Sequence, residues 1–411
     1  MLPRHPMADR ETDLVAPERL ALGGDLSFAA EAKAQAKGPQ GSARSRRRKA
    51  GPRDWMWQLR RAITTVDGLA QALDLTPEEL AGARRAERAG LPIRVTPYYL
   101  GLADKNDPRC PIRMQCVPRA EEAVTVPGDL DDPLGEVAHE MAPGLVQRYP
   151  DRALLLATDQ CAVYCRFCTR SRMVGDGAGP SPQDALEPAM KYLEAHPEVR
   201  DVIVSGGDPL TVATDRLVRL LARIRRIPSV ETIRLATRAP VTIPQRITGE
   251  LVRALRPFHP IWVMTHFNHP KELTKEAARA CERLADAGFP VMNQTVLLRG
   301  INDSAPVLEE LFRGLVRRRV RPYYLLQADP VRGTGHLRTP LATGIAILEQ
   351  LQGRLSGIAL PKLIVDTPGG MGKVPVGPDF IVERSEGRAV LRTHRAARVT
   401  YLDPPVGSGG E

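Results

Sequence analysis

Aromatic residues and long apolar stretches are scarce in this sequence of 411 residues. Phe, Trp and Tyr make up 4% of it, and no apolar run approaches the roughly 20 residues that a membrane-spanning helix requires. The N-terminus also lacks the apolar core of a secretion signal. Hydrophobic residues still reach 43%, which is ordinary for a globular protein. We therefore expect a cytoplasmic protein without a membrane partner.

Acidic residues are outnumbered, since 58 Lys and Arg residues face 48 Asp and Glu residues for a net charge of +10. Much of the excess lies between Arg44 and Lys49, in a segment with few large apolar residues. Such a composition cannot bury enough surface to fold, so residues 1–52 are predicted to form a disordered basic tail. A nucleic-acid-binding arm is the alternative. No aromatic residues alternate with the basic ones, so a nucleic-acid partner is not expected.

Cysteine is scarce as well, but three of the six cysteines fall within eight residues. Clustered cysteines in a cytoplasmic chain indicate a metal site or catalysis rather than disulfides. Cys161, Cys165 and Cys168 form a C-x3-C-x2-C pattern, and soft thiolates favour iron–sulfur clusters or zinc. Three ligands leave one metal position open, which suits a reactive cluster, whereas structural zinc needs four closed ligands. A structural metal loop with a fourth ligand at Cys110 or Cys116 is the alternative.

Six apolar runs of strand length alternate with helix-period segments from about residue 151. This alternation predicts a parallel sheet, and six units favour a partial (βα)6 TIM-like barrel over a closed eight-stranded one. We divide the chain accordingly into a helical and irregular region (53–150), the barrel (151–340) and a C-terminal segment (341–411). Polar residues follow directly on the runs, where parallel barrels carry their chemistry, which predicts one composite site. The runs cover residues 154–157, 202–204, 232–235, 261–264, 291–296 and 322–326.

Several segments carry helical signals. Thr76 precedes a proline and two glutamates, which predicts a helix start there. Apolar residues recur at helical spacing over 217–224 and 273–284, and residues 55–63 can form a further helix. Cys281 lies on the apolar face of the 273–284 segment, so it is predicted to be a buried core residue.

The cysteine pattern, with Phe167 before the third cysteine and an apolar run before the first, resembles that of the radical S-adenosylmethionine (SAM) superfamily. Over residues 90–380 the chain further resembles the lysine 2,3-aminomutase family, whose members are radical SAM enzymes that depend on pyridoxal 5'-phosphate (PLP). The stretches that carry this resemblance are residues 96–100, 148–152, 168–170, 237–240, 244–248, 265–270, 293–300 and 366–373.

The resemblance implies that the three clustered cysteines, Cys161, Cys165 and Cys168, bind a [4Fe–4S] cluster with SAM at its open iron. One electron, from a donor such as flavodoxin or ferredoxin, then cleaves SAM to a 5'-deoxyadenosyl radical. The protein's part is to aim that radical and exclude competing reactions. Residues that the resemblance and the strand-end position assign to SAM are Ser205, Gly206, Gly207, Asp208, His266 and Gln294.

The glycine-rich loop at 369–372 precedes Lys373, which matches the family lysine that forms a Schiff base with PLP. Such a lysine needs an amine that can lose its proton in a partly desolvated pocket. Arg148 and Arg152 match the family's phosphate-binding arginines, and Tyr149 between them is placed to pack on the cofactor. An exposed loop lysine, and arginines paired with nearby carboxylates, are the alternatives.

The implied reaction is an isomerisation in which the amino group of L-lysine migrates to the neighbouring carbon and gives β-lysine. Arg170 matches the family residue that binds the α-carboxylate, while Asp329 and Asp366 match the pair that holds the distal ammonium. Arginine is an alternative substrate, whereas a glutamate 2,3-aminomutase should not keep this acidic pair, because it would repel a second carboxylate. A radical SAM enzyme without PLP and an Fe–S or zinc protein that binds nucleic acid are further alternatives.

Two departures from the family pattern matter. Ser304 stands where some members have a zinc-binding cysteine, and no cysteine follows Cys281, so no zinc is predicted. Ser171 interrupts a run of arginines that often follows the cysteine pattern. We also expect a homo-oligomer.

Overall fold

The computed structural model describes residues 51–88, 92–175 and 182–404, with the backbone alone described for 182–185. The chain divides into Met1–Lys49 and Ala50–Glu411, and only the second unit contains described residues. The predicted basic tail thus lies outside them, apart from its last two residues, and the boundaries predicted at 150 and 340 stay predictions. No helix within the described ranges is long and apolar enough to cross a membrane.

Ten strands form one sheet in chain order, with β3 to β9 parallel and with β1, β2 and β10 antiparallel at its two edges. The six predicted runs lie in β3 to β8, so the partial parallel barrel is confirmed. The parallel strand β9 and the antiparallel edge strands were not predicted. The strands are β1 Glu140–Ala142, β2 Leu145–Tyr149, β3 Arg152–Leu156, β4 Asp201–Ser205, β5 Thr232–Ala236, β6 Ile261–Thr265, β7 Val291–Leu297, β8 Val320–Gln327, β9 Lys362–Thr367 and β10 Gly372–Val376.

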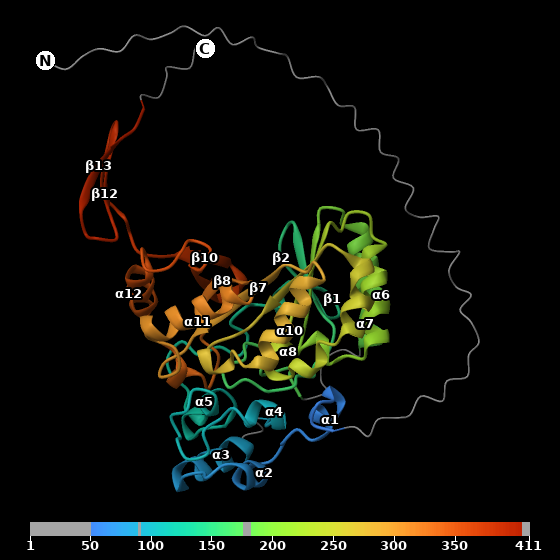
Figure 1. Ribbon diagram of the computed structural model, residues 1–411. Coiled ribbons are helices and arrows are strands. Elements are labelled where there is room, and N and C mark those ends of the chain that lie inside the picture. The colour runs from blue at the N-terminus through green and yellow to red at the C-terminus, as the bar shows by residue number, and fades with distance from the viewer. Residues whose placement is uncertain (1–50, 89–91, 176–181, 405–411) are drawn as a thin grey trace, which may run out of the picture. The chain divides into compact units, whose positions relative to one another are not determined.

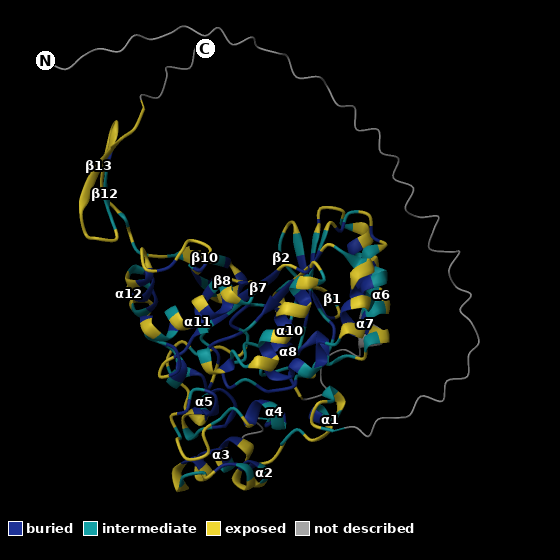
Figure 2. Ribbon diagram, in the orientation of Figure 1, coloured by how far each residue is buried: buried dark blue, intermediate teal, exposed yellow. Residues whose placement is uncertain are grey.

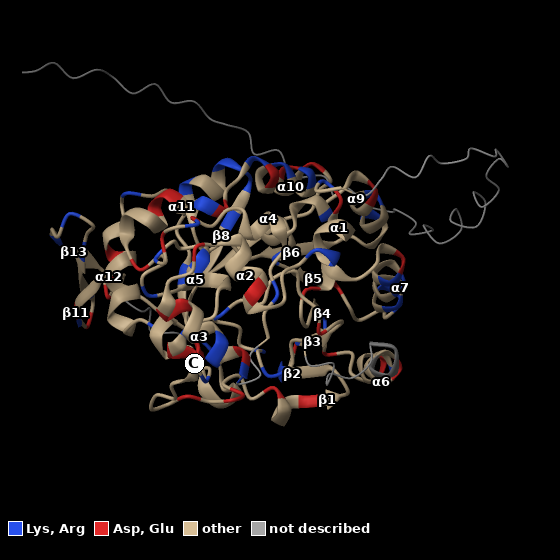
Figure 3. Cartoon of the chain, turned by 90° about the horizontal axis from the view of Figure 1, so that it is seen from below, with Lys and Arg blue, Asp and Glu red and all other residues tan. Residues whose placement is uncertain are grey.

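The strands are arranged in an arc, and helices lie around its outer side (Figure 3). Two helical segments predicted from apolar spacing are confirmed as α7 and α10. Their apolar faces are buried against the sheet, and Cys281 is fully buried on α10, as expected. The outer helices are α6 Pro182–Ala195, α7 Thr214–Arg225, α9 Gly249–Leu255, α10 Lys275–Asp286, α11 Ala305–Arg317 and α12 Leu341–Leu351.

The region before the barrel holds short helices (Figure 1). The helix start predicted at Thr76 is confirmed, because its hydroxyl accepts a hydrogen bond from Glu79 N at 3.1 Å and the Glu79 carboxylate accepts one from Thr76 N at 3.0 Å. The helix predicted over 55–63 ends at Arg60, and Ile63 forms a β-bridge with Val95 instead. These helices are α1 Trp55–Arg60, α2 Val66–Ala72, α3 Pro77–Arg88, α4 Pro97–Leu100 and α5 Arg113–Cys116, and α8 Ala239–Thr242 follows β5.

Beyond β10 a separate antiparallel sheet is formed by β11 Ile381–Ser385, β12 Arg388–Arg392 and β13 Arg398–Leu402. Its residues are mostly exposed, unlike the strands of the large sheet (Figure 2). Sequence reasoning placed no strands here.

Side chains alternate along the parallel strands between the helix-covered core and the inside of the arc. Val202 and Val204 of β4, like Ile233 and Leu235 of β5, are fully buried in the core under the helices. The alternate residues Ile203 and Arg234 line a cavity on the inner side. The two-residue period thus separates the residues that hold the barrel together from those that face its interior.

Candidate active site

Three thiols gather on the loop that follows β3. Cys161, Cys165 and Cys168 line one cavity together with Tyr164 and Ser171. Burial, followed by the neighbouring cysteines, raises the pKa of Cys161 well above its ordinary value and that of Cys168 to about 11. Thiolates at these buried positions are therefore stable only beside a cation. The donor set fits an iron–sulfur cluster held at three corners.

The other three cysteines lie outside this cavity. Cys116 donates its thiol to Ile112 O at 3.3 Å within α5, and burial raises its pKa to about 12. Cys110 accepts a hydrogen bond from Asp104 N at 3.2 Å, and Cys281 is in the core. The alternative of a fourth ligand at Cys110 or Cys116 thus gains no support from their positions.

The glycines after β4 allow close packing against the cysteine loop. Gly206 has φ +114°, and Gly207 donates its N–H to Thr158 O at 2.5 Å. A Cβ on Gly207 would lie 2.4 Å from Gln160 O, closer than any side chain allows. Only glycine therefore permits this approach. The C-terminal end of β4, which the sequence predicted to approach SAM, therefore packs against the loop that carries Cys161.

Asp208 is committed to protein donors. Its carboxylate accepts hydrogen bonds from Thr237 Oγ1 at 2.6 Å and from Arg238 N at 2.8 Å, and burial raises its pKa. It thereby joins the loop after β4 to the loop after β5. Its side chain holds the site's framework, while its backbone N–H donates to Gln160 O at 2.8 Å.

His266 lies at the C-terminal end of β6 with its ring against Phe167, 5.6 Å between centroids. Its Nε2 is buried and has no hydrogen-bond partner. Burial, followed by the charge of Arg238, lowers the pKa of His266 to about 3, so the ring is neutral. An unpartnered neutral nitrogen next to the cysteine loop fits a bound ligand, because a buried polar atom without a partner is costly.

A cavity of about 360 Å³ on the inner side of the arc brings together residues predicted for PLP, for SAM and for substrate. Tyr323 and Tyr324 of β8 and Arg234 of β5 also line it. The predicted residues that line it are Arg148, Tyr149, Arg152, Arg170, Ser205, Gln294, Asp366 and Lys373.

Lys373 enters this cavity from β10. Its partner in the ladder is Asp366 of β9, and its Nζ forms an ion pair with that carboxylate. The Lys373 N–H donates to Tyr149 Oη at 2.7 Å, and the glycine before it, Gly372, has φ +105°. The amine is thus partly buried and held in one direction inside the cavity, as a Schiff-base lysine requires.

The two arginines predicted for the PLP phosphate differ in their contacts. Arg148 donates to Leu134 O and to Asp366 Oδ1, both at 3.2 Å. Arg152 has its guanidinium 4.0 Å from the centre of the Tyr149 ring and lies 3.6 Å from Asp151. Arg152 is therefore the less engaged of the two, because its carboxylate partner is largely exposed.

Arg170 is held by Glu136, a residue that sequence reasoning did not identify. Arg170 Nε and Nη2 donate to Glu136 Oε1 at 2.9 and 2.7 Å, and Glu136 is almost fully buried. Arg172 also pairs with Glu136, at 3.4 Å. The only sequence signal for Glu136 is its place in a stretch rich in proline and poor in periodicity, which is too weak to single it out.

Asp329, just beyond β8, lies near Asp366. Burial, followed by the Asp366 carboxylate, raises the pKa of Asp329 to about 7, against opposing effects of Lys373, Arg148 and Arg170. The structure therefore brings the predicted acidic pair together beside the predicted PLP lysine.

Two family models and several curated proteins match this chain. The family model described as the radical SAM superfamily matches residues 155–311, and the model described as lysine-2,3-aminomutase matches residues 348–407. The chain is 49% identical over 351 residues to L-lysine 2,3-aminomutase of Fusobacterium nucleatum, with 85% of this chain and 82% of that protein covered.

Two further relatives differ in the substrate for which they are named. The L-lysine 2,3-aminomutase of Clostridium subterminale is 47% identical, over 85% of this chain and 84% of that protein. The glutamate 2,3-aminomutase of Clostridioides difficile is 40% identical, over 86% and 84%. The chain therefore belongs to the lysine 2,3-aminomutase family of the radical SAM superfamily, whose members are isomerases that use a [4Fe–4S] cluster and S-adenosylmethionine.

Proposed function

We propose that this chain converts L-lysine to β-lysine by moving the amino group from the α-carbon to the β-carbon. The observation that carries the proposal is the acidic pair formed by Asp366, which lines the cavity, and Asp329, whose pKa is raised by burial and then by the Asp366 carboxylate. A distal ammonium removed from water needs close counter-charge, which two carboxylates supply. The relatives named for lysine support the same substrate.

The Lys373 side chain supports this assignment because it ends in the same alkylammonium as free lysine. Its Nζ is paired with Asp366, so this carboxylate already accepts a primary ammonium. We propose that Lys373 binds PLP covalently through Nζ. Asp366, which also accepts a hydrogen bond from Arg148, is proposed to hold the distal ammonium of the substrate together with Asp329.

When bound, the cluster and SAM supply hydrogen-abstracting radical chemistry, and PLP supplies a π-system that delocalises spin. The chain's own residues bind and orient. Arg170 is proposed to receive the substrate's α-carboxylate, with Glu136 fixing the direction of its guanidinium. Arg152 and Arg148 are proposed to hold the PLP phosphate, over the ring of Tyr149. The residues proposed for SAM are Ser205, Gly206, Gly207, Asp208, His266 and Gln294.

Arginine and glutamate are the competing substrates. A guanidinium also suits two carboxylates, whereas the side-chain carboxylate of glutamate would meet like charges at Asp329 and Asp366. The test is to incubate the reduced enzyme with SAM, PLP and each amino acid in turn, and to separate the β-isomers by chromatography. β-Lysine as the main product is expected. A main product of β-arginine or β-glutamate would refute the lysine assignment.

Substrate affinity is expected to depend on pH through Asp329, whose pKa burial and Asp366 raise to about 7. Below this pH Asp329 is protonated and neutral, whereas above it Asp329 adds a negative charge beside the substrate ammonium. The KM for lysine should therefore fall about tenfold from about pH 6 to about pH 8. Steady-state kinetics across this range measure it.

The control for this pH profile is a matched pair of variants. Asp329→Asn should raise KM at high pH and flatten the profile, since no group at this position then ionises. Asp303→Asn changes a half-buried aspartate that accepts from Gly300 N, and should keep the wild-type slope. An unaltered slope in Asp329→Asn would show that another group controls binding.

A one-electron donor of the flavodoxin or ferredoxin type is proposed as the physiological reductant, because the cluster must be reduced before SAM is cleaved.

The two rival interpretations of the sequence predict different absorbance spectra. A radical SAM enzyme without PLP has no absorbance band that borohydride bleaches, and a zinc protein that binds nucleic acid is colourless. The homo-oligomer stays a prediction.

A further inference from the structure

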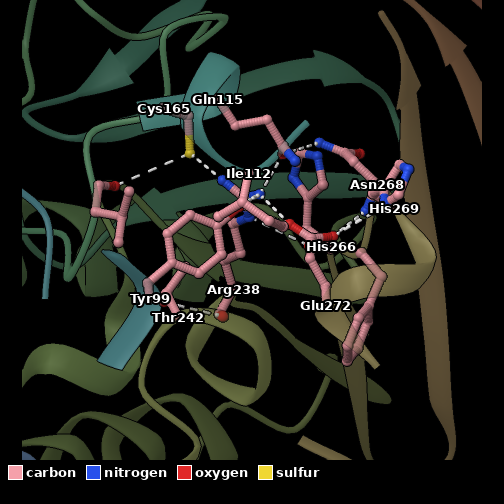
Figure 4. A network of polar contacts seen from close by, with 12 residues as sticks. Tyr99, Ile112, Gln115, Cys165, Arg238, Thr242, His266, Asn268, His269 and Glu272 are labelled. Carbon is pink, nitrogen blue, oxygen red and sulfur yellow. Dashed lines mark hydrogen bonds and ion pairs between the residues drawn. The ribbon is translucent and has the colours of Figure 1, made fainter. Parts of the chain in front are cut away.

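A buried arginine outside the predicted set contacts one of the clustered cysteines. Arg238 follows β5 and is 8% exposed. Its Nη1 donates to Cys165 Sγ at 2.7 Å, while its Nη2 donates to Gln115 Oε1 at 2.6 Å and to Glu272 Oε1 at 2.8 Å. Figure 4 shows the guanidinium between the sulfur and the acidic side chain. In a loaded enzyme this sulfur is a cluster thiolate.

The direction of the guanidinium is fixed by partners from several elements. Tyr99 of α4 accepts from Arg238 Nη2 at 3.0 Å and donates to Glu272 Oε1 at 2.7 Å. Glu272 is fully buried, and its other oxygen accepts the backbone N–H groups of Asn268 and His269 at 2.6 and 3.0 Å. Every partner is itself held, so Nη1 has one direction available, and it is toward Cys165.

Residues of three stretches that carry the family resemblance meet in this network. Tyr99 belongs to residues 96–100, Arg238 to residues 237–240, and Asn268 to residues 265–270. Asn268 Nδ2 donates to Gln115 Oε1 at 3.0 Å, which orients the amide that receives Arg238. These motifs thus share one physical task, which is to aim Arg238.

Other buried arginines in the described part of the chain are satisfied differently. Arg113 directs Nε and Nη2 as a fork to Glu79 and gives Nη1 to the carbonyls of Asp104 and Lys105. Arg166 makes the same fork to Glu122 and gives Nη1 to a carbonyl. Arg238 instead reaches its glutamate through Nη2 alone and keeps Nη1 for the sulfur. Arg113 and Arg166 show that a buried arginine can be fully paired without a sulfur acceptor.

We propose that Arg238 is a positioning residue for the iron–sulfur cluster, which it makes easier to reduce by donating a charge-assisted hydrogen bond to the Cys165 thiolate. The inference rests on the proposed cluster-binding role of the three cysteines. One electron enters the cluster from an external low-potential donor, and no bond forms or breaks in this step. The cluster gains one negative charge, and a cationic donor at a ligand sulfur stabilises that state.

The test is the reduction potential of the cluster in Arg238→Gln and Arg238→Lys. Each protein is reconstituted without oxygen, its iron and sulfide are counted, and the reduced cluster is followed by electron paramagnetic resonance during titration with dithionite. For Arg238→Gln we expect the equilibrium constant of reduction to fall about tenfold, which is about 59 mV for one electron. Arg238→Lys should fall less, because a point charge replaces the fork.

Arg113→Gln is the matched control, since Arg113 is also buried and paired with a glutamate but donates no hydrogen bond to a sulfur. It should lower thermal stability and leave the potential unchanged. Unchanged potentials in both Arg238 variants, or an equal shift in Arg113→Gln, would overturn the proposal. If Arg238→Gln binds no iron, the potential of Arg238→Lys decides alone. A wild-type protein that assembles no four-iron cluster would overturn the cluster assignment itself.

Discussion

Lys373→Ala is expected to lower kcat/KM for lysine by at least about 1000-fold, which corresponds to about 4 kcal/mol of lost transition-state stabilisation. Lys373 is the one lysine among the residues that line the 360 Å³ cavity, so no other described amine can replace its Nζ there. The alanine variant should also lose the PLP absorbance band that borohydride bleaches in the wild type. Absorbance spectra before and after borohydride, with lysine turnover measured in parallel, check both effects.

Lys362→Ala is the control for this variant. Lys362 begins β9, the strand that carries Asp366, and its side chain is exposed, so turnover and the borohydride-sensitive band should persist. Mass analysis of the reduced wild-type protein should find the cofactor's mass on the peptide that contains Lys373. Cofactor found on a different lysine, or turnover retained in Lys373→Ala, would remove Lys373 from the reaction.

The fold was predictable from the sequence where periodicity is strong. The runs at 202–204 and 232–235 became β4 and β5 because their alternate residues are buried under helices on one side and face the cavity on the other. β9 has the same character, yet it was not predicted, because only its last two residues, Asp366 and Thr367, belong to a stretch that carries the family resemblance. The C-terminal strands β11 and β13 are exposed along their whole length, so no apolar period marks them.

The candidate site was predictable in its residue types but not in its pairings. Spacing and strand-end position identified the cysteines, and the resemblance supplied Lys373 and Asp366. Nothing in the sequence says that Arg148 contacts Asp366 or that Glu136 holds Arg170. Such pairs join loops far apart along the chain, and their geometry is decided by tertiary packing rather than by local pattern.

Arg238 shows the same limit for a residue that the family resemblance included but to which it gave no role. It lies within residues 237–240, one of the stretches that carry the family resemblance, but an arginine after a strand has many possible partners. Its role follows only when Cys165, Glu272 and Tyr99 are seen around it at 2.7 to 3.0 Å. The sequence thus locates residues that matter, whereas the direction of a side chain comes from the packed structure.

Cys168→Ala is expected to leave the protein with little or no iron after anaerobic reconstitution and to abolish SAM cleavage and lysine turnover. Two thiolates remain, and they leave two irons of a cube without a protein ligand. Burial already opposes the thiolate forms of Cys161 and Cys168, so the site depends on the metal's charge to stay ionised. Iron and sulfide analysis, with the brown absorbance of the cluster, measures the loss.

Two other cysteine variants separate this cluster-specific loss from a general loss of fold. Cys281→Ala removes a fully buried sulfur from the core under α10 and should cost about 1 kcal/mol of stability while iron is retained. Cys116→Ala removes the nearby thiol that donates to Ile112 O and should also keep the iron, because that sulfur lies outside the cysteine cavity. Loss of iron from Cys116→Ala to the same extent as from Cys168→Ala would indicate a closed four-thiolate site. Such a site has no open iron for SAM, and the radical mechanism would then have to be abandoned.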